Sequence, residues 1–149
     1  MEAKIKVLGM AEHNGRVHLR TIPDGTAASL EKVINPMLSH NAREVITDGS
    51  PTYCFVIPEH QHVATDHTQE LKEMGYVSMK TVEGAFSLFK RGVVGSYHKL
   101  SKDHLDSYLG EFCWRYNRRK AQPWMFQNLL REVSTKKPMT YKTLTHEIF

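Results

Sequence analysis

The chain has 149 residues, of which 40% are hydrophobic and 24% are charged. This length suffices for one domain with a sizeable core, and the composition is that of a globular protein in water. No apolar run is long enough to cross a bilayer, and the start lacks the basic-then-apolar order of a secretory signal. We therefore expect a cytoplasmic protein with no membrane partner, in which Cys54 and Cys113 are reduced thiols.

The net charge of +4 is spread unevenly along the chain. Residues 1–89 carry 8 Lys and Arg against 11 Asp and Glu, whereas residues 90–149 carry 12 against 5. A basic C-terminal part indicates a polyanionic partner, and nucleic acid is the commonest one. The alternative is a solvated basic face with no partner, and charge alone does not separate the two.

Residues 4–24 predict two β-strands joined by a turn. Asn14-Gly15 supplies the turn, because both residues tolerate a positive φ. In the second strand Val17, Leu19 and Ile22 approximate an alternation with polar residues, which gives one apolar and one wetter face.

Residues 24–40 predict a helix with Thr26 as its N-cap. Pro36 should kink or end this helix, because proline has no amide hydrogen to donate. Residues 43–50 then predict a short apolar strand that stops at Asp48-Gly49. Hairpin, helix and strand in this order indicate an α/β domain.

The rest of the chain is more helical. Residues 50–65 are irregular, with a short strand near His62-Val63, and helices are expected over residues 66–75 and from about Thr81. Residues 101–119 predict a longer helix, in which apolar side chains recur at helical spacing: Leu105, Tyr108, Leu109, Phe112 and Tyr116. We expect residues 121–149 to form a C-terminal extension that is partly helical or loosely ordered.

The helix that begins near Thr81 places an acid and a base on one side. Residues seven apart return almost to the same face of a helix, so Glu83 and Lys90 line up, with Lys80 and Arg91 nearby. The simplest interpretation is the charged outer face of a surface helix. The functional interpretation is a carboxylate that binds a metal and a cation that holds a phosphate.

A second carboxylate, Asp48, follows a predicted strand. Functional sites in α/β sheets gather at the carboxyl ends of strands. An aspartate before glycine is also common in plain turns, so Asp48 has both interpretations.

Three segments together resemble one family: residues 47–53 (TDGSPTY), residues 81–120 and the preceding hairpin. They resemble bacterial insertion-sequence transposases of the branch whose ribonuclease-H-like DDE domain carries a T-N-x-x-E-G-x-x-S-x-x-K-R-G block. A helix with the pattern R-Y-N-x-R follows that block in the branch. The resemblance runs from about Lys4 to Lys120.

The resemblance implies a ribonuclease-H-like mixed sheet flanked by helices, which performs metal-dependent DNA cleavage and strand transfer. Its three acidic residues hold two ions of Mg²⁺ or Mn²⁺, which clamp the entering and leaving oxygens of the phosphoryl transfer. Asp48 matches the second acid and Glu83 the third, so both are expected metal ligands and catalytic residues. Lys90 matches the basic residue that holds phosphate.

The sequence departs from the family pattern at two places. In the family, the first catalytic Asp lies on a central strand that precedes the hairpin. This chain begins at the hairpin. We therefore expect an N-terminally truncated catalytic domain over residues 1–120, with two strand edges left without a partner and impaired catalysis. Lys80 stands where the family commonly has Asn; it would repel metal ions, and it could pair with Glu83 instead.

Two further groups of residues carry alternatives. His60, His62 and His67 could form a transition-metal site, although no cysteine joins them in the sequence. The alternative that the resemblance implies is a place near the mid-domain strand, with one of them lining the active-site cleft. The cations at the end of the long helix suit the helix dipole without any ligand, and they also suit DNA phosphates: Arg115, Arg118, Arg119 and Lys120. No Ser-His-Asp, Cys-His, phosphate-loop or dinucleotide-binding pattern is visible.

The function predicted from the sequence is that of a transposase-derived protein with DNA as its partner. DNA contacts are expected from Lys80, Lys90, Arg91, Arg115, Arg118 and Arg119. The alternative is a non-catalytic remnant that binds DNA or dimerises, either with itself or with a full-length transposase. Metal-dependent nicking would favour the first, and metal-independent binding with a steep salt dependence would favour the second.

Overall fold

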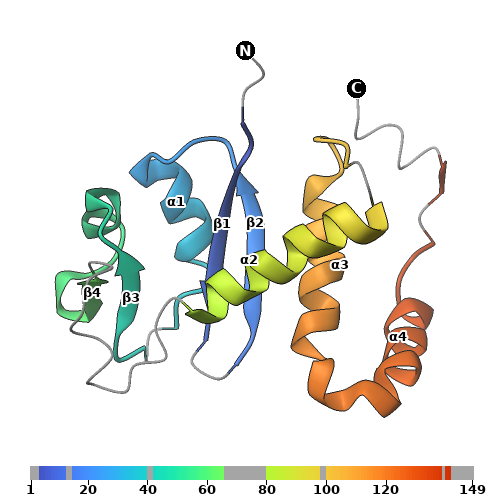
Figure 1. Cartoon of the computed structure of the whole chain (residues 1–149). Helices are drawn as coiled ribbons and strands as arrows, with labels where there is room; N and C mark the ends of the chain where they lie inside the picture. The colour runs from blue at the N-terminus through green and yellow to red at the C-terminus, as the bar shows by residue number, and fades with distance from the viewer. Residues whose placement is uncertain are drawn as a thin grey trace.

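The structure is a computed structural model of the chain, and it describes residues 4–12, 15–39, 42–65, 80–97, 100–138 and 140–141. The helix predicted over residues 66–75 and the residue His67 lie outside these ranges. Figure 1 shows a central hairpin, with residues 27–65 on one side, residues 105–134 on the other, and the helix of residues 80–92 running across its front. Within the described ranges, every helix is too short or too polar to span a membrane.

The hairpin forms as predicted. Strand β1 (Lys6–Ala11) pairs antiparallel with β2 (Val17–Ile22), in a register that runs from Lys6 opposite Ile22 to Ala11 opposite Val17. Because side chains alternate between the two faces of a strand, Val17 and Leu19 point to one face and Ile22 points to the other. All three are buried, so both faces of the hairpin are covered.

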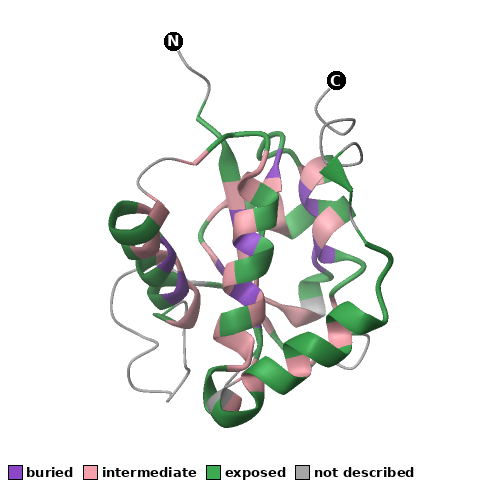
Figure 2. Ribbon diagram, turned by 90° about the vertical axis from the view of Figure 1, so that its right-hand side faces the viewer, coloured by how far each residue is buried: buried purple, intermediate pink, exposed green. Residues whose placement is uncertain are grey.

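Two clusters of buried side chains cover these two faces. The larger cluster joins β2 to helices α2 and α3 through Val17, Leu19, Ala85, Phe89, Leu109 and Cys113. The smaller cluster joins the hairpin to helix α1 through Leu8, Ile22, Leu30 and Ile34. Figure 2 shows the buried residues on the strands and on the inward sides of the helices. The hairpin is therefore the layer that holds the domain together.

Helix α1 (Ala27–Ile34) starts and stops where the sequence predicts. Thr26 is the N-cap, and its Oγ1 accepts a hydrogen bond from the Ser29 amide at 3.4 Å. The helix ends before Pro36, which cannot continue the hydrogen-bond ladder.

Strand β3 (Val45–Asp48) ends at Asp48 as predicted, and it pairs in parallel with β4 (His62–Thr65). Short 3-10 turns at Pro51–Phe55 and Glu59–Gln61 connect the two strands. The α/β class is thus confirmed. The described strands form two separate sheets, β1 with β2 and β3 with β4, and no described strand lies between β1 and β3. The ribonuclease-H-like arrangement stays a prediction.

Helix α2 (Lys80–Gly92) buries Ala85 and Phe89 and continues as a π-helical turn over Val93–Tyr97. Helix α3 (Leu105–Asn117) buries Leu109 and Cys113. The predicted apolar stripe of α3 is confirmed, because Leu109 is fully buried and Leu105, Tyr108, Phe112 and Tyr116 pack against the same cluster. Cys113 was not part of that stripe and belongs to the core.

Side chains of α3 seal the outer edge of β2. Alternate amides of the strand donate to them: Val17 to Asn117 Oδ1 at 2.8 Å, Leu19 to Cys113 Sγ at 3.2 Å and Thr21 to Asp106 Oδ1 at 2.8 Å. Asn117 Nδ2 also donates to the Val17 carbonyl at 2.9 Å. An unpaired strand edge invites association with other chains, and here the helix satisfies it.

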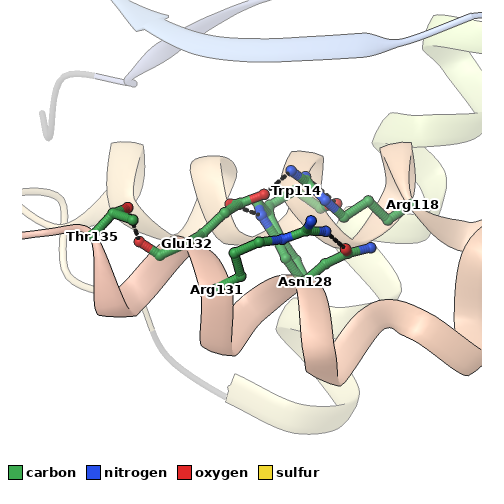
Figure 3. A network of polar contacts seen from close by, with 6 residues as sticks. All are labelled: Trp114, Arg118, Asn128, Arg131, Glu132 and Thr135. Atoms are coloured by element: carbon green, nitrogen blue, oxygen red, sulfur yellow. Dashed lines mark hydrogen bonds and ion pairs between the residues drawn. The ribbon is translucent and has the colours of Figure 1, made fainter.

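Helix α4 (Met125–Ser134) follows a 3-10 turn over Arg119–Trp124 and has no buried residue. The helix lies within the predicted C-terminal extension, residues 121–149. Its contact with α3 is polar, since Trp114 Nε1 donates to Glu132 Oε2 at 2.8 Å and Arg118 forms an ion pair with Glu132 (Figure 3). Its apolar side chains are exposed instead: Phe126, Leu129, Leu130 and Val133.

Candidate functional site

Asp48 is the last residue of β3 and is half-buried. Its Oδ1 accepts a hydrogen bond from the Ser50 amide at 3.3 Å, which is the aspartate turn that the Asp-Gly pair suggested. The carboxylate is therefore partly used by the turn, and the hydrogen bond holds it at the end of the strand. Both sequence interpretations of Asp48 remain compatible with this geometry.

A cavity of about 370 Å³ lies between the hairpin and β3. Its walls include β1 residues from Leu8 to Ala11, all of β3 and the first turn of α2 at Thr81 and Val82. Asp48 thus shares one cavity with the start of the helix that carries Glu83. Two more carboxylates, those of Glu12 and Glu44, also line the cavity. The lining is therefore mostly apolar and contains three acidic residues.

Gly9 sets how closely α2 approaches the hairpin. A Cβ atom at this position would lie 2.6 Å from Phe86 Cε2 and 2.7 Å from Val82 Cγ1, which is closer than carbon atoms approach in proteins. Only a residue without a side chain allows α2 to cross β1 here. The glycine in the strand was visible in the sequence, and its role in placing the helix was not deduced from it.

The charged residues of α2 lie on its outer side, as the helical spacing predicts. Lys80, Glu83, Lys90 and Arg91 are all exposed. Glu83 lies in the first turn, and Lys90 and Arg91 lie in the last turn, where the helix dipole favours each sign of charge. Among the described residues no ion pair joins Lys80 to Glu83, so the suggested replacement of a metal by Lys80 finds no support.

The predicted metal ligands form an incomplete set. Asp48 and Glu83 supply two carboxylates, and in the part of the chain that the structure describes no group of three or more His, Cys, Asp or Glu side chains is placed to hold a metal ion. Mg²⁺ is usually held through one or two carboxylates, and water completes its octahedron. Asp48 and Glu83 would supply two carboxylates, and the described residues do not close the site around an ion.

His62 belongs to a polar cluster that sequence reasoning missed. Its Nε2 lies 2.7 Å from Thr47 Oγ1, and Thr47 Oγ1 in turn donates to the Asp48 carbonyl at 2.9 Å. The other ring nitrogen, Nδ1, lies 3.8 Å from Cys54 Sγ. This Cys-His pair was invisible in the sequence because strand pairing, and not a motif, brings the two residues together. The side chain of His60 is outside the described set, so the three-histidine cluster stays a prediction.

The arginines at the end of α3 have partners within the chain. Arg115 pairs with Glu111 at 2.7 Å, and Arg118 pairs with Glu132 and lies 4.3 Å above the Trp114 ring. Arg119 lies 4.1 Å above the Tyr116 ring and donates to the Tyr116 carbonyl at 2.8 Å.

Glu132 is the acid at the centre of this arrangement (Figure 3). The hydrogen bond from Trp114, helped by Arg118, lowers the pKa of Glu132. Arg118 is thus paired with an acid of α4. Among the described residues, the cations of α2 form no ion pair with an acid. The α2 cations are the freer ones for an external anion.

Comparison with known proteins identifies a family. The model of the family described as the ISXO2-like transposase domain matches residues 1–117, which is most of the chain and contains Asp48, Glu83 and Lys90. No curated protein and no solved structure matches the chain. The matched range covers both sheets, the cavity and helices α1 to α3, and the chain belongs to the ISXO2-like transposase domain family.

Proposed function

We propose that the protein acts on DNA in the transposition of an insertion sequence, with Asp48, Glu83 and Lys90 as the residues of the reaction site. The observation that carries the proposal is the family match over residues 1–117, within which Asp48 and the first turn of α2 share one cavity. The family generally uses a divalent metal. Asp48 and Glu83 are the carboxylates that would contribute to holding it.

The exposed cations of α2 are the proposed phosphate contacts. Lys80, Lys90 and Arg91 lie along the outer side of one helix, and lysine binds phosphate as a point charge whereas arginine can bind it through two N–H groups. Lys90 lies about two turns from Glu83, so DNA held by Lys90 runs along the helix towards the acid. Arg115, Arg118 and Arg119 are weaker candidates, because acids, aromatic rings or carbonyl groups of the chain already hold them.

A second candidate function is a DNA-binding module with little or no catalysis. It is favoured by the incomplete carboxylate set, since the described residues offer no group of three acids for metal ions. The same chain could then occupy DNA ends or join a full-length transposase without cutting. Both candidates require DNA binding, and they differ in whether metal-dependent cleavage follows.

Nicking of a supercoiled plasmid separates the two candidates. The reaction is followed with Mg²⁺, with Mn²⁺ and with a chelator for the wild-type chain, Asp48→Ala and the remote control Glu31→Gln. Metal-dependent nicking that Asp48→Ala abolishes and Glu31→Gln retains supports the catalytic candidate. Binding without nicking in any metal supports the binding module, and the absence of both DNA binding and nicking contradicts both candidates.

A further inference from the structure

Trp124 is an exposed aromatic ring in a well-formed part of the chain. Its exposed fraction is 64%, which is high for the largest apolar side chain. Trp124 follows Pro123 at the end of the Arg119–Trp124 turn and directly precedes α4. Ordered backbone on both sides therefore positions the residue. Burial of the ring therefore does not account for its position.

The ring borders an open hollow that offers polar groups. The other walls are Ala121, Gln127, Asn128 and Arg131. Arg131 Nη2 donates to Asn128 Oδ1 at 2.6 Å, which holds the guanidinium group at the rim (Figure 3). The hollow is thus lined by an aromatic ring, two amides and a guanidinium group, from Trp124, Gln127, Asn128 and Arg131.

Arg131 is exposed, and its charge is one of those that lower the pKa of Glu132. The neighbouring acid, Glu132, accepts from Trp114 through Oε2 and pairs with Arg118 through Oε1, so both of its oxygens point to α3. Among the described residues no ion pair involves Arg131. Trp114, Arg118 and Arg119 use their rings and charges within the chain, whereas Trp124 and Arg131 present theirs to solvent.

We propose that this hollow binds one nucleotide of single-stranded DNA. The base stacks on Trp124, the amides of Gln127 and Asn128 contact its edge, and Arg131 holds the adjacent phosphate. A duplex does not suit the hollow, because its bases are covered on both faces. This inference rests on the proposed function for its choice of DNA, and the hollow lies beyond the matched residues and across the hairpin from Asp48 (Figure 1).

The chemistry of α4 argues against two other occupants. A membrane-surface helix needs a polar face rich in Lys and Arg, whereas α4 carries one arginine and one glutamate. A second copy of the chain would rather cover the apolar side chains Phe126, Leu129, Leu130 and Val133, and none of these lines the hollow.

The test is binding of a fluorescein-labelled oligothymidine of about 10 nucleotides, and of a duplex of the same length, measured by anisotropy over a range of salt. Trp124→Ala should weaken binding of the single strand by about 5- to 150-fold without changing the salt slope, because stacking releases no counterions. Trp124→Phe keeps a stacking ring and should retain most of the affinity. Arg131→Gln should reduce the magnitude of the slope by about 0.7.

Phe126→Ala is the matched control, because it removes another exposed ring of the same segment that is outside the hollow. Unchanged affinity in Trp124→Ala overturns the inference, as does an equal loss in Phe126→Ala, which would show that the loss is not specific to the hollow. Tighter binding of an oligouridine RNA than of the DNA strand also overturns it. If the chain still binds the duplex but the single-strand predictions fail, this inference is wrong and the proposed function stands. Failure of the inference and failure of the proposed function are therefore distinguishable.

Discussion

Asn117 joins the last turn of α3 to the edge of β2 through two hydrogen bonds to Val17. In the resemblance this residue belongs to the R-Y-N-x-R pattern, and its geometry here is structural. Asn117→Ala leaves the amide and carbonyl of Val17 without these partners, and we expect a loss of about 1–3 kcal/mol of unfolding free energy. Urea denaturation measures it, with the exposed Lys120→Ala as control; equal stabilities would contradict the assigned role.

The two cysteines differ in their surroundings and should differ in reactivity. Cys54 is exposed and faces His62, whereas Cys113 is buried and accepts from the Leu19 amide. Burial raises the pKa of the Cys113 thiol above its ordinary value, so less of the reactive thiolate is present at a given pH. Alkylation with iodoacetamide near neutral pH, followed by peptide mass spectrometry, should label Cys54 first. Labelling of Cys113 should require a higher pH or unfolding, and labelling of both at one rate would refute the burial of Cys113.

At the scale of elements, the contact between β1 and α2 depends on Gly9. Gly9→Val would place side-chain atoms where Phe86 and Val82 already lie, so α2 must shift and the loss should be about 1–3 kcal/mol. Gly110→Ala is the matched control, because nothing lies within 4 Å of a Cβ atom there and alanine favours a helix interior. Thermal melting should show a lower midpoint for the first variant and an equal or higher midpoint for the second. Two equal midpoints would show that α2 does not pack against β1 as described.

The edge of β1 that faces the cavity should be the weak point of the hairpin. The opposite edge of the hairpin, on β2, is sealed by α3, and the β1 edge has no described strand beside it. Hydrogen exchange resolved by residue should show slow exchange for β1 amides that point to β2 and faster exchange for the alternate amides. Uniform protection along β1 would mean that another segment pairs with this edge.

The sequence predicted the elements well and their assembly less well. Thr26, Pro36 and the stripe of α3 act locally, through a cap, a missing amide hydrogen and helical spacing, and the structure confirms all three. The parallel pairing of β3 with β4 joins two strands across an irregular segment, and no local pattern encodes it. The engagement of Arg118 by Glu132 was missed for the same reason, since the acid lies on the next helix.

At the scale of the whole molecule, the hairpin separates two surfaces of different chemistry. Strands β3 and β4 lie on one side of the hairpin and helices α3 and α4 lie on the other (Figure 1). Asp48 lines the cavity beside β3, and Trp124 lines the hollow next to α4. Helix α2 crosses the hairpin at Gly9, and its cations are exposed. In the proposed function, DNA held by the α2 cations would lie along the helix whose first turn borders the cavity.

The most direct test of this account is duplex DNA binding as a function of salt, compared with a variant in which Lys80, Lys90 and Arg91 are all glutamine. Each phosphate that a cation neutralises contributes about 0.9 to the magnitude of the log–log slope, so the variant should lose about 2.7. A control variant with glutamine at the exposed residues Lys32, Lys136 and Lys137 changes the net charge equally and should keep the slope. A wild-type chain that binds no DNA, or two variants with equal slopes, would contradict the placement of DNA on α2.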